Sequence, residues 1–249
     1  MTIDLPDISG RDLRYADLDT PLTGFLCQAE HLTGSQPAIL LIHGGAGLDD
    51  HARQQARRYA ALGYTVLACD MFGDGIAGDR DRVINCLMAL RDDPAFLVRR
   101  ARAGLAALAA TPGTSGQAAA VGFCFGGLAA LQLARSGELL AAAVSIHGSL
   151  ATSAPAKPGS VRAPLLACHG AADPHVPLSD VTAFADEMNE AGADWQLIMY
   201  GGAPHGFTHA HAAPGAMPGV AYHEAADRRS FAATRDLLAE SFGTLAVSR

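Results

Sequence analysis

The segment Gly122-Phe123-Cys124-Phe125-Gly126-Gly127 places a cysteine between an apolar run and a stretch with helical character. A strand that turns sharply into a helix needs very small residues two positions before and two positions after the turn, because backbone atoms come into near contact there. Gly122 and Gly126 meet this requirement. Such a turn presents Cys124 at the N-terminus of the helix, whose dipole favours a thiolate. The pattern predicts a cysteine nucleophile. A glycine-rich turn that contains a buried cysteine without a catalytic role would have the same sequence pattern.

A nucleophile of this kind needs a base, and the base needs a carboxylate that orients it. Asp173 follows an apolar run that ends at Cys168, and His205 follows the next run, from Trp195 to Met199. The carboxyl ends of parallel strands share one edge of a sheet, so these side chains are expected to meet Cys124 there. Taken singly, the aspartate is also typical of a turn and the histidine of a surface loop. Their order along the chain favours a catalytic triad.

A hydrolytic site also needs N–H donors for the oxyanion that forms during the reaction. The residue after the nucleophile, Phe125, offers one at the start of the helix. Gly45 is expected to offer the second, because it lies in the glycine-rich stretch that follows an earlier apolar run. His43, at the start of this stretch, is interpreted as an anchor of the loop in preference to a catalytic group.

Short apolar runs alternate with helical patterns along the chain, which predicts an α/β fold with a mostly parallel central sheet and helices on both faces. An additional antiparallel strand is expected first. The predicted strands cover residues 22–28, 38–42, 64–69, 118–121, 141–146, 165–168 and 195–199.

Capping residues indicate where several helices begin and end. Asp49 or Asp50 starts a helix that runs to Leu62, and Asp93 followed by Pro94 starts another. Further helices are expected from Ser179 to Gly192 and from about Tyr222 to Phe242. The loop over residues 209–220, which follows His205 and is rich in proline and glycine, is a candidate lid.

Composition narrows the classes of protein that fit. The 249 residues are 49% hydrophobic and 17% charged, which fits a single globular domain over residues 1–249. A net charge of -7 disfavours nucleic acid as a partner. The polar first residues and the absence of a long apolar run predict a cytoplasmic protein without a membrane segment. The five scattered cysteines suggest neither disulfides nor a zinc site.

Taken together, these motifs resemble the dienelactone hydrolase family of α/β-hydrolases. The resemblance covers nearly the whole chain and rests on residues 122–127, the Gly-Ala-Ala-Asp that ends at Asp173, the His-Gly-Phe that begins at His205, and Asp70-Met71-Phe72-Gly73. It implies a carboxylic ester hydrolase that cleaves a small ester or lactone through a Cys-His-Asp triad and a thioester acyl-enzyme. It also implies no metal or organic cofactor, and a monomer or homodimer.

The sequence departs from the family members that cleave dienelactones. Gly44 stands where those members have a glutamate that activates the thiol, and His209 stands where they have an arginine that binds the substrate carboxylate. The resemblance therefore supports the fold and the nucleophile of the family more strongly than the substrate of the dienelactone-cleaving members. The candidate substrate-binding residues are Arg80, Arg82, Phe123, Phe207 and His209.

Three other functions compete with this interpretation. Gly45-Ala46-Gly47 after a strand suggests dinucleotide binding, but aspartates at the following helix start would repel a pyrophosphate. His205, His209 and His211 suggest a metal site, against which Gly206 and Pro214 argue because they disfavour a helix. Cys124 could also serve as a thiol sensor or in a ligand-binding protein without turnover, a function that the lack of a resolving cysteine pattern disfavours.

Overall fold

The computed structural model describes residues 7–30, 34–73, 76, 79–210 and 218–243. The chain divides into two compact units, residues 1–120 and 121–249. Strand β5 (Thr114–Phe123) runs from the first unit into the second. The single-domain organisation over residues 1–249 stays a prediction.

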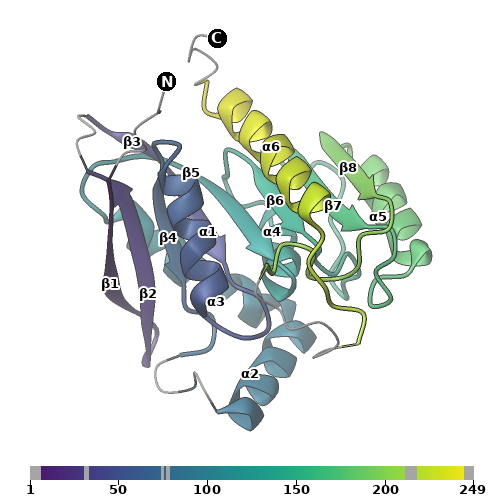
Figure 1. The fold of residues 1–249 in the computed structure, drawn as a ribbon, viewed down its shortest axis with the longest axis horizontal. Coiled ribbons are helices and arrows are strands. Elements are labelled where there is room, and N and C mark those ends of the chain that lie inside the picture. Colours follow the sequence, from purple (N-terminus) through teal and green to yellow (C-terminus); the bar gives the residue numbers. More distant parts are fainter. Residues whose placement is uncertain (1–6, 31–33, 74–75, 77–78, 211–217, 244–249) are drawn as a thin grey trace. The chain divides into compact units, whose positions relative to one another are not determined.

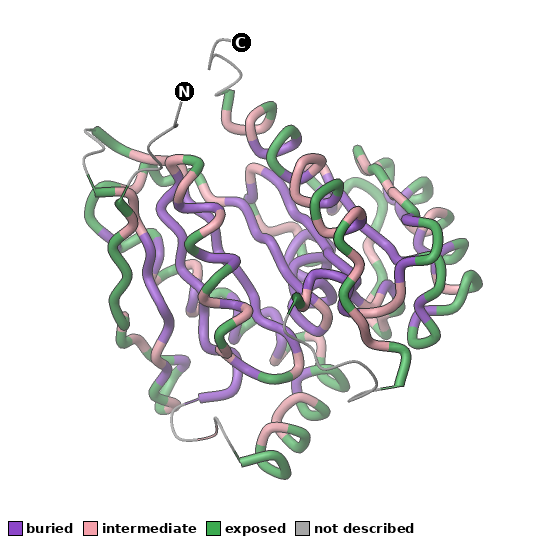
Figure 2. The backbone as a smooth tube through the Cα atoms, viewed as in Figure 1, coloured by how far each residue is buried: buried purple, intermediate pink, exposed green. Residues whose placement is uncertain are grey.

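The first unit is built on strands in the order β1-β2-β4-β3-β5. β1 (Ile8–Asp17) and β2 (Thr20–Ala29) form an antiparallel hairpin, and β2 also runs antiparallel to β4 (Thr65–Cys69). β3 (Gln36–Ile42) lies parallel to β4. Consecutive side chains of a strand point to opposite faces, and all those of β4 are buried, so both faces of the sheet are covered there (Figure 2).

The hairpin contains a strand that the hydrophobic pattern does not predict. The expected strand at residues 22–28 is present as β2, but β1 precedes it. Most side chains of β1 are exposed, among them Arg11, Asp12 and Arg14, so the segment has no apolar run that would mark it. It forms because every one of its residues pairs with β2.

Two predicted helices of the first unit are confirmed at their N-termini. Asp49 caps α1 (Asp50–Ala60) by accepting a hydrogen bond from the Ala52 N–H at 3.0 Å. Asp93 caps α3 (Pro94–Ala109), which begins with a proline as expected. A carboxylate therefore occupies the N-terminus of α1, where the dinucleotide-binding alternative would require a pyrophosphate.

A third helix of the first unit, α2 (Arg80–Asp92), was not predicted. Asp79 caps it, and Val83, Leu87 and Leu90 recur at helical spacing, so the signal was present in the sequence. Only Leu90 of this helix is buried. The weak segregation of apolar and polar residues explains why the pattern is hard to recognise.

The second unit continues the strand order as β5-β6-β7-β8. β6 (Ala143–Ile146), β7 (Leu165–Gly170) and β8 (Trp195–Tyr200) are parallel, and all residues of β6 and β7 are buried. α4 (Phe125–Arg135) packs against β6 and α6 (Glu224–Ser241) packs against β7 (Figure 1). The expected α/β architecture with a mostly parallel sheet is thereby confirmed.

The remaining helices of the second unit begin and end close to the predicted positions. α5 covers Leu178–Ala191 and ends at Gly192, which adopts a left-handed conformation with φ 65°. This conformation favours glycine, as the sequence suggested. α6 ends one residue before the predicted Phe242 and begins two residues after Tyr222. Residues 211–217 of the candidate lid lie outside the described residues.

Candidate active site

The sharp turn predicted around Cys124 is formed at the junction of β5 and α4. β5 ends at Phe123 and α4 begins at Phe125, so Cys124 is the only residue between them. It has φ 54° and ψ -116°, a conformation that costs a non-glycine residue about 1–3 kcal/mol and recurs at functional sites. A Cβ added at Gly122 would lie 1.8 Å from the carbonyl oxygen of Gly126. No side chain larger than hydrogen fits at Gly122 in this turn.

The histidine and the aspartate predicted to act with Cys124 lie beside it in the second unit. The Nε2 atom of His205 is 3.1 Å from the Cys124 Sγ, and its Nδ1 atom is 2.7 Å from the Asp173 Oδ2. Because a carboxylate oxygen only accepts, Nδ1 carries the proton and donates it to Asp173. Nε2 is thereby directed at the sulfur. The three groups form one hydrogen-bonded series.

His205 and Asp173 are both largely removed from water. The Asp173 side chain is 0% exposed and that of His205 is 12% exposed. Burial by itself would lower the pKa of His205, but hydrogen bonds to Asp173 and Cys124 outweigh it and raise the pKa to about 10. Burial would raise the pKa of Asp173, and the hydrogen bond from His205 reverses this effect, so the pKa lies below its usual value. The site favours a protonated His205 beside an ionised Asp173.

This pair should make stability depend on pH in a defined window. The raised pKa of His205 contributes stability that is complete below pH 6.5 and lost as the pH rises through about 10. The lowered pKa of Asp173 contributes stability above pH 3.8 that is lost as the pH falls through its value in the folded protein. Urea unfolding of wild type and His205→Gln should therefore give a difference in unfolding free energy that shrinks from pH 6.5 toward pH 10. A difference that stays constant over this range would contradict the proposed pairing.

The loop that carries His205 is held by residues that sequence patterns did not single out. The His205 N–H donates to the Gly219 carbonyl at 3.0 Å, and the Ala221 N–H donates to the His205 carbonyl at 3.2 Å. On the aspartate loop, the backbone N–H of His175 donates to the Asp173 Oδ1 at 2.8 Å. Both oxygens of the Asp173 carboxylate are thus hydrogen-bonded, which fixes its orientation toward His205.

The two predicted oxyanion donors lie in different units. Phe125 is the first residue of α4, so its N–H lies at a helix N-terminus, where the helix offers no acceptor. Gly45 lies between β3 and α1 of the first unit. The loop around it is anchored by buried His43, which donates from Nδ1 to the Gly44 carbonyl at 2.7 Å and accepts the Met71 N–H at Nε2 at 3.1 Å. Burial lowers the pKa of His43, in keeping with a neutral anchoring ring.

The candidate substrate-binding residues differ widely in exposure. Arg80 and Arg82 lie exposed in the first turn of α2, in the first unit. His209 is half-buried in the second unit, and its ring centroid lies 5.7 Å from that of His147. Phe123 and Phe207 are 1% and 0% exposed, so almost none of either ring is open to a ligand in this structure. Direct contact of these residues with substrate stays a prediction.

The five cysteines differ in how readily they should react. Burial raises the pKa of Cys27 to about 11 and that of Cys168 to about 12, and it also raises the pKa of Cys69 and Cys86. Only Cys124 combines partial exposure with a helix N-terminus and a neighbouring base. Brief treatment with iodoacetamide followed by peptide mapping should show Cys124 labelled first. Faster labelling of Cys27 or Cys86 with activity retained would contradict the nucleophile assignment.

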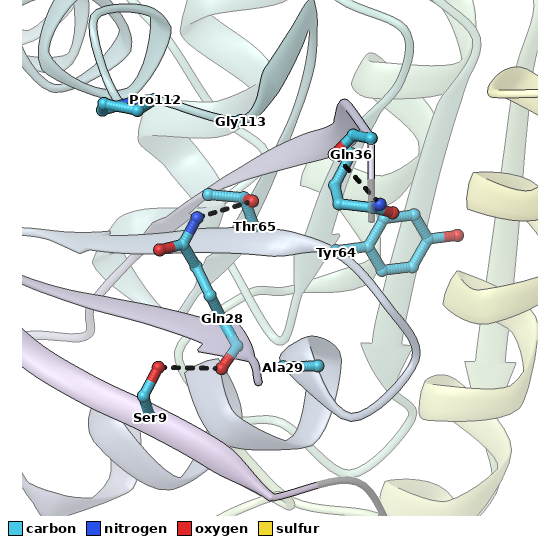
Figure 3. A pocket seen from close by; sticks show the side chains of 9 residues that line it. Ser9, Gln28, Ala29, Gln36, Tyr64, Thr65, Pro112 and Gly113 are labelled. Carbon is cyan, nitrogen blue, oxygen red and sulfur yellow. Dashed lines mark hydrogen bonds between the residues drawn. The ribbon is translucent and has the colours of Figure 1, made fainter. Parts of the chain in front are cut away.

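A cavity of about 260 Å³ lies in the first unit, at the amino ends of β3 and β4 (Figure 3). Its lining is mainly uncharged and polar, with a hydrogen bond from the Gln28 Nε2 to the Thr65 Oγ1 at 3.3 Å. None of the predicted catalytic or substrate-binding residues lines it. The cavity therefore does not identify the site of chemistry.

The part of the chain that the structure describes holds neither a metal-binding cluster nor a helix that could span a membrane. Within that part, no group of three or more His, Cys, Asp or Glu side chains is arranged to hold a metal ion. His205, a member of the alternative metal site, is hydrogen-bonded to Asp173 and Cys124 instead, and His211 lies outside the described residues. Among the described helices, none is long and apolar enough to cross a bilayer.

Comparison with known proteins identifies the family. A model of the dienelactone hydrolase family matches residues 22–242. The chain belongs to this family. It is 27% identical over 198 residues to a Yersinia pestis protein with the name "Putative carboxymethylenebutenolidase", covering 75% of this chain and 74% of that protein. The resemblance inferred from the motifs is confirmed, and the protein is a hydrolase.

Solved structures of the dienelactone hydrolase type match nearly the whole chain. The structure of m3DLH is 39% identical, covers 94% of this chain and 98% of its own, and has a TM-score of 0.87. A dienelactone hydrolase-like promiscuous phosphotriesterase from metagenomic libraries is 37% identical, with the same coverage and a TM-score of 0.86. The α/β-hydrolase fold is confirmed by these neighbours.

Proposed function

We propose that this family member hydrolyses a small ester or lactone with Cys124 as nucleophile, His205 as general base and acid, and Asp173 as the carboxylate that orients His205. The observation that carries the proposal is the series of two hydrogen bonds, 3.1 Å from His205 to the sulfur and 2.7 Å from His205 to the carboxylate. A base in contact with both a nucleophile and an orienting acid is the arrangement that acyl transfer requires.

The reaction proceeds in two halves. His205 holds the proton of the Cys124 thiol, and the resulting thiolate attacks the carbonyl carbon while the Phe125 N–H stabilises the oxyanion. Gly45 stays the residue that the sequence predicts as the second donor. The C–O bond to the alcohol then breaks, and the leaving oxygen takes the proton from His205. In the second half His205 accepts a proton from water, the hydroxide attacks the thioester, and the C–S bond breaks. The sulfur leaves as thiolate and recovers its proton from His205. No metal or organic cofactor has a role in this scheme.

The proposal is tested with a panel of esters, thioesters and lactones assayed on wild type, Cys124→Ala and a matched control, Cys86→Ala. Cys86 is also half-buried, but its Sγ faces the Phe72 carbonyl at 3.5 Å in the first unit. Turnover that is lost in Cys124→Ala and kept in Cys86→Ala, with an acyl-enzyme of the expected mass, supports the proposal. A wild type that turns over nothing while binding or sensing through its thiol supports the alternative of a sensor or ligand-binding protein.

Within this reaction class we expect a preference for neutral substrates. A carboxylated lactone needs a fixed positive charge, and His209 stands in place of an arginine that would supply one. Loss of a charge-assisted hydrogen bond corresponds to at least about tenfold in kcat/KM. Comparing kcat/KM for a carboxylated dienelactone and for its methyl ester measures this preference.

Preference for the acid would contradict the expectation of a neutral substrate. In that case Arg80 or Arg82, at the start of α2, would be the source of the positive charge. Arg82→Ala would then lose the preference for the acid and keep its turnover of the methyl ester.

A second candidate activity is the hydrolysis of a neutral aryl phosphotriester. It is favoured by the 37% identical neighbour that is described as a promiscuous phosphotriesterase, which this chain matches over 94% of its length. The Cys124 thiolate would attack phosphorus, forming an S–P bond as the P–O bond to the aryl group breaks and the leaving oxygen takes the proton from His205. Water, losing a proton to His205, would then attack phosphorus, and the S–P bond would break to release the phosphodiester and the thiolate. Adding such a phosphotriester to the panel tests this activity. Phenolate release that is equal in wild type and Cys124→Ala would reject it.

A further inference from the structure

His147 is a buried residue with an unusual backbone conformation directly after β6. It is 0% exposed and has φ 42°, in the left-handed region. Among the described residues, the other non-glycine residues with positive φ are Leu18, which is exposed in the turn between β1 and β2, and Cys124. Such a conformation costs about 1–3 kcal/mol and persists only where surrounding contacts enforce it. The contacts around His147 therefore hold its backbone in this conformation.

The end of β6 is hydrogen-bonded to all three segments that carry the proposed triad. The Cys124 N–H donates to the Ile146 carbonyl at 3.0 Å, and the His147 N–H donates to the Cys168 carbonyl at 2.8 Å. Cys168 belongs to β7, the strand that leads to the loop of Asp173. The His147 Nε2 lies 2.8 Å from the Thr208 Oγ1, on the loop that carries His205. The adjacent residues Ile146 and His147 are thus hydrogen-bonded to Cys124, to the strand that leads to Asp173, and to the loop that carries His205.

The ring of His147 also packs against the proposed base. Its centroid lies 5.4 Å from that of His205 at an interplanar angle of 64°, and 5.0 Å from that of Phe207 at 84°. Edge-to-face contacts of this kind restrict how far a neighbouring ring can turn. Rotation of His205 about its side-chain bonds would break either the 3.1 Å contact with sulfur or the 2.7 Å contact with Asp173.

We propose that His147 is a positioning residue for the reaction, acting through its hydrogen bond to Thr208 and its ring contact with His205. The inference rests on the proposed function of the Cys124, His205 and Asp173 series. The hydrogen bond to Thr208 holds the loop of His205 at a fixed distance from the end of β6. The Cys124 N–H is hydrogen-bonded to Ile146, at the same end of β6. The end of this strand therefore positions both the base and the nucleophile.

The test removes the hydrogen bond between His147 and Thr208 by changing each of the two residues in turn. Thr208→Val keeps the shape of the side chain and removes its hydroxyl, while His147→Asn tolerates positive φ but is too short to reach Thr208. Each variant should lower kcat by about 10- to 100-fold with KM changed little, because a small misplacement of a reacting group costs rate more than binding. The double variant should be no worse than the poorer single variant, since both remove the same contact. Thr208→Ser should recover most of the lost rate.

A matched control separates positioning from general stability. Thr152→Val, elsewhere in the second unit, removes a 2.8 Å hydrogen bond from the hydroxyl to the Gln132 side chain and a 3.0 Å hydrogen bond from the Ala154 N–H to the hydroxyl, and it should leave kcat unchanged. All variants are assayed well below their melting temperatures. The pH dependence of iodoacetamide labelling of Cys124 should move to higher pH in Thr208→Val and His147→Asn, because a displaced His205 stabilises the thiolate less. A purely structural role would lower only the melting temperature.

The outcomes separate the role of His147 from the proposed catalytic function. Wild-type kcat and labelling in Thr208→Val, together with turnover that is lost in Cys124→Ala, would overturn the role of His147 and leave the proposed function intact. Turnover that persists in Cys124→Ala would overturn the proposed function itself. Should His147→Asn fail to fold, Thr208→Val still decides the question, because it leaves the backbone at position 147 untouched.

Discussion

Replacing Cys124 with alanine is expected to lower kcat by at least about 10⁴-fold for any ester that the wild type hydrolyses, because the proposed reaction forms its covalent intermediate on this sulfur. The fold should survive, since alanine fits the turn wherever cysteine does. Steady-state kinetics on the best substrate of the panel, with the melting temperature measured in parallel, checks this prediction.

The control for this experiment is Cys86→Ala, which should behave as wild type. Cys124→Ser is an informative companion, because serine keeps a nucleophilic oxygen but is a much poorer nucleophile than a thiolate at neutral pH. A Cys124→Ala variant that retained more than a small part of wild-type turnover would place the nucleophile elsewhere in the chain.

Replacing His205 with alanine is expected to lower kcat by at least about a hundredfold, because general acid–base catalysis contributes that much or more. The loss has two parts. The thiol loses the group that accepts its proton, and the leaving alcohol loses the group that donates one. Steady-state kinetics over a range of pH checks the prediction, and the variant should regain activity as rising pH ionises the thiol without assistance.

The His205→Ala substitution should also affect stability, so the melting temperature of the variant is measured beside its kinetics. The Asp173 side chain is fully buried and, among the residues that the structure describes, would keep only the hydrogen bond from the His175 N–H, so the variant should also be less stable than wild type. His51→Ala, which changes a half-buried histidine on α1 of the first unit, is a suitable control. Near-normal turnover of His205→Ala with an unchanged melting temperature would move the base elsewhere, with His209 as the first candidate.

Local features could be predicted from the sequence wherever neighbouring residues decide them. The turn around Cys124 depends on Gly122 and Gly126, within a few positions of each other, and a Cβ at Gly122 meets the Gly126 backbone as expected. Helix N-termini at Asp49 and Asp93 depend on a side chain and an N–H two or three residues apart. Such short-range requirements leave a readable pattern in the sequence.

Elements that depend on distant partners could not be predicted in the same way. β1 has few buried residues and exists because β2 pairs with it along its length. Phe123 and Phe207 are buried, and their ring centroids lie 6.0 Å and 5.0 Å from that of His147, contacts that no local pattern predicts. Because both are aromatic residues next to the predicted triad in the sequence, they are predicted to form part of the substrate-binding surface.

The sequence by itself indicated the family, the strands from β2 onward, and three residues predicted to carry the chemistry, because each of these residues follows a strand at its carboxyl end. It did not indicate β1 or α2. Only the tertiary structure decided that these side chains touch. The hydrogen bond between Cys124 and His205 joins residues 81 positions apart, and the one between His147 and Thr208 joins residues 61 apart. Contacts between residues so far apart arise from the pairing and packing of whole strands, and no repeating pattern in the sequence indicates them.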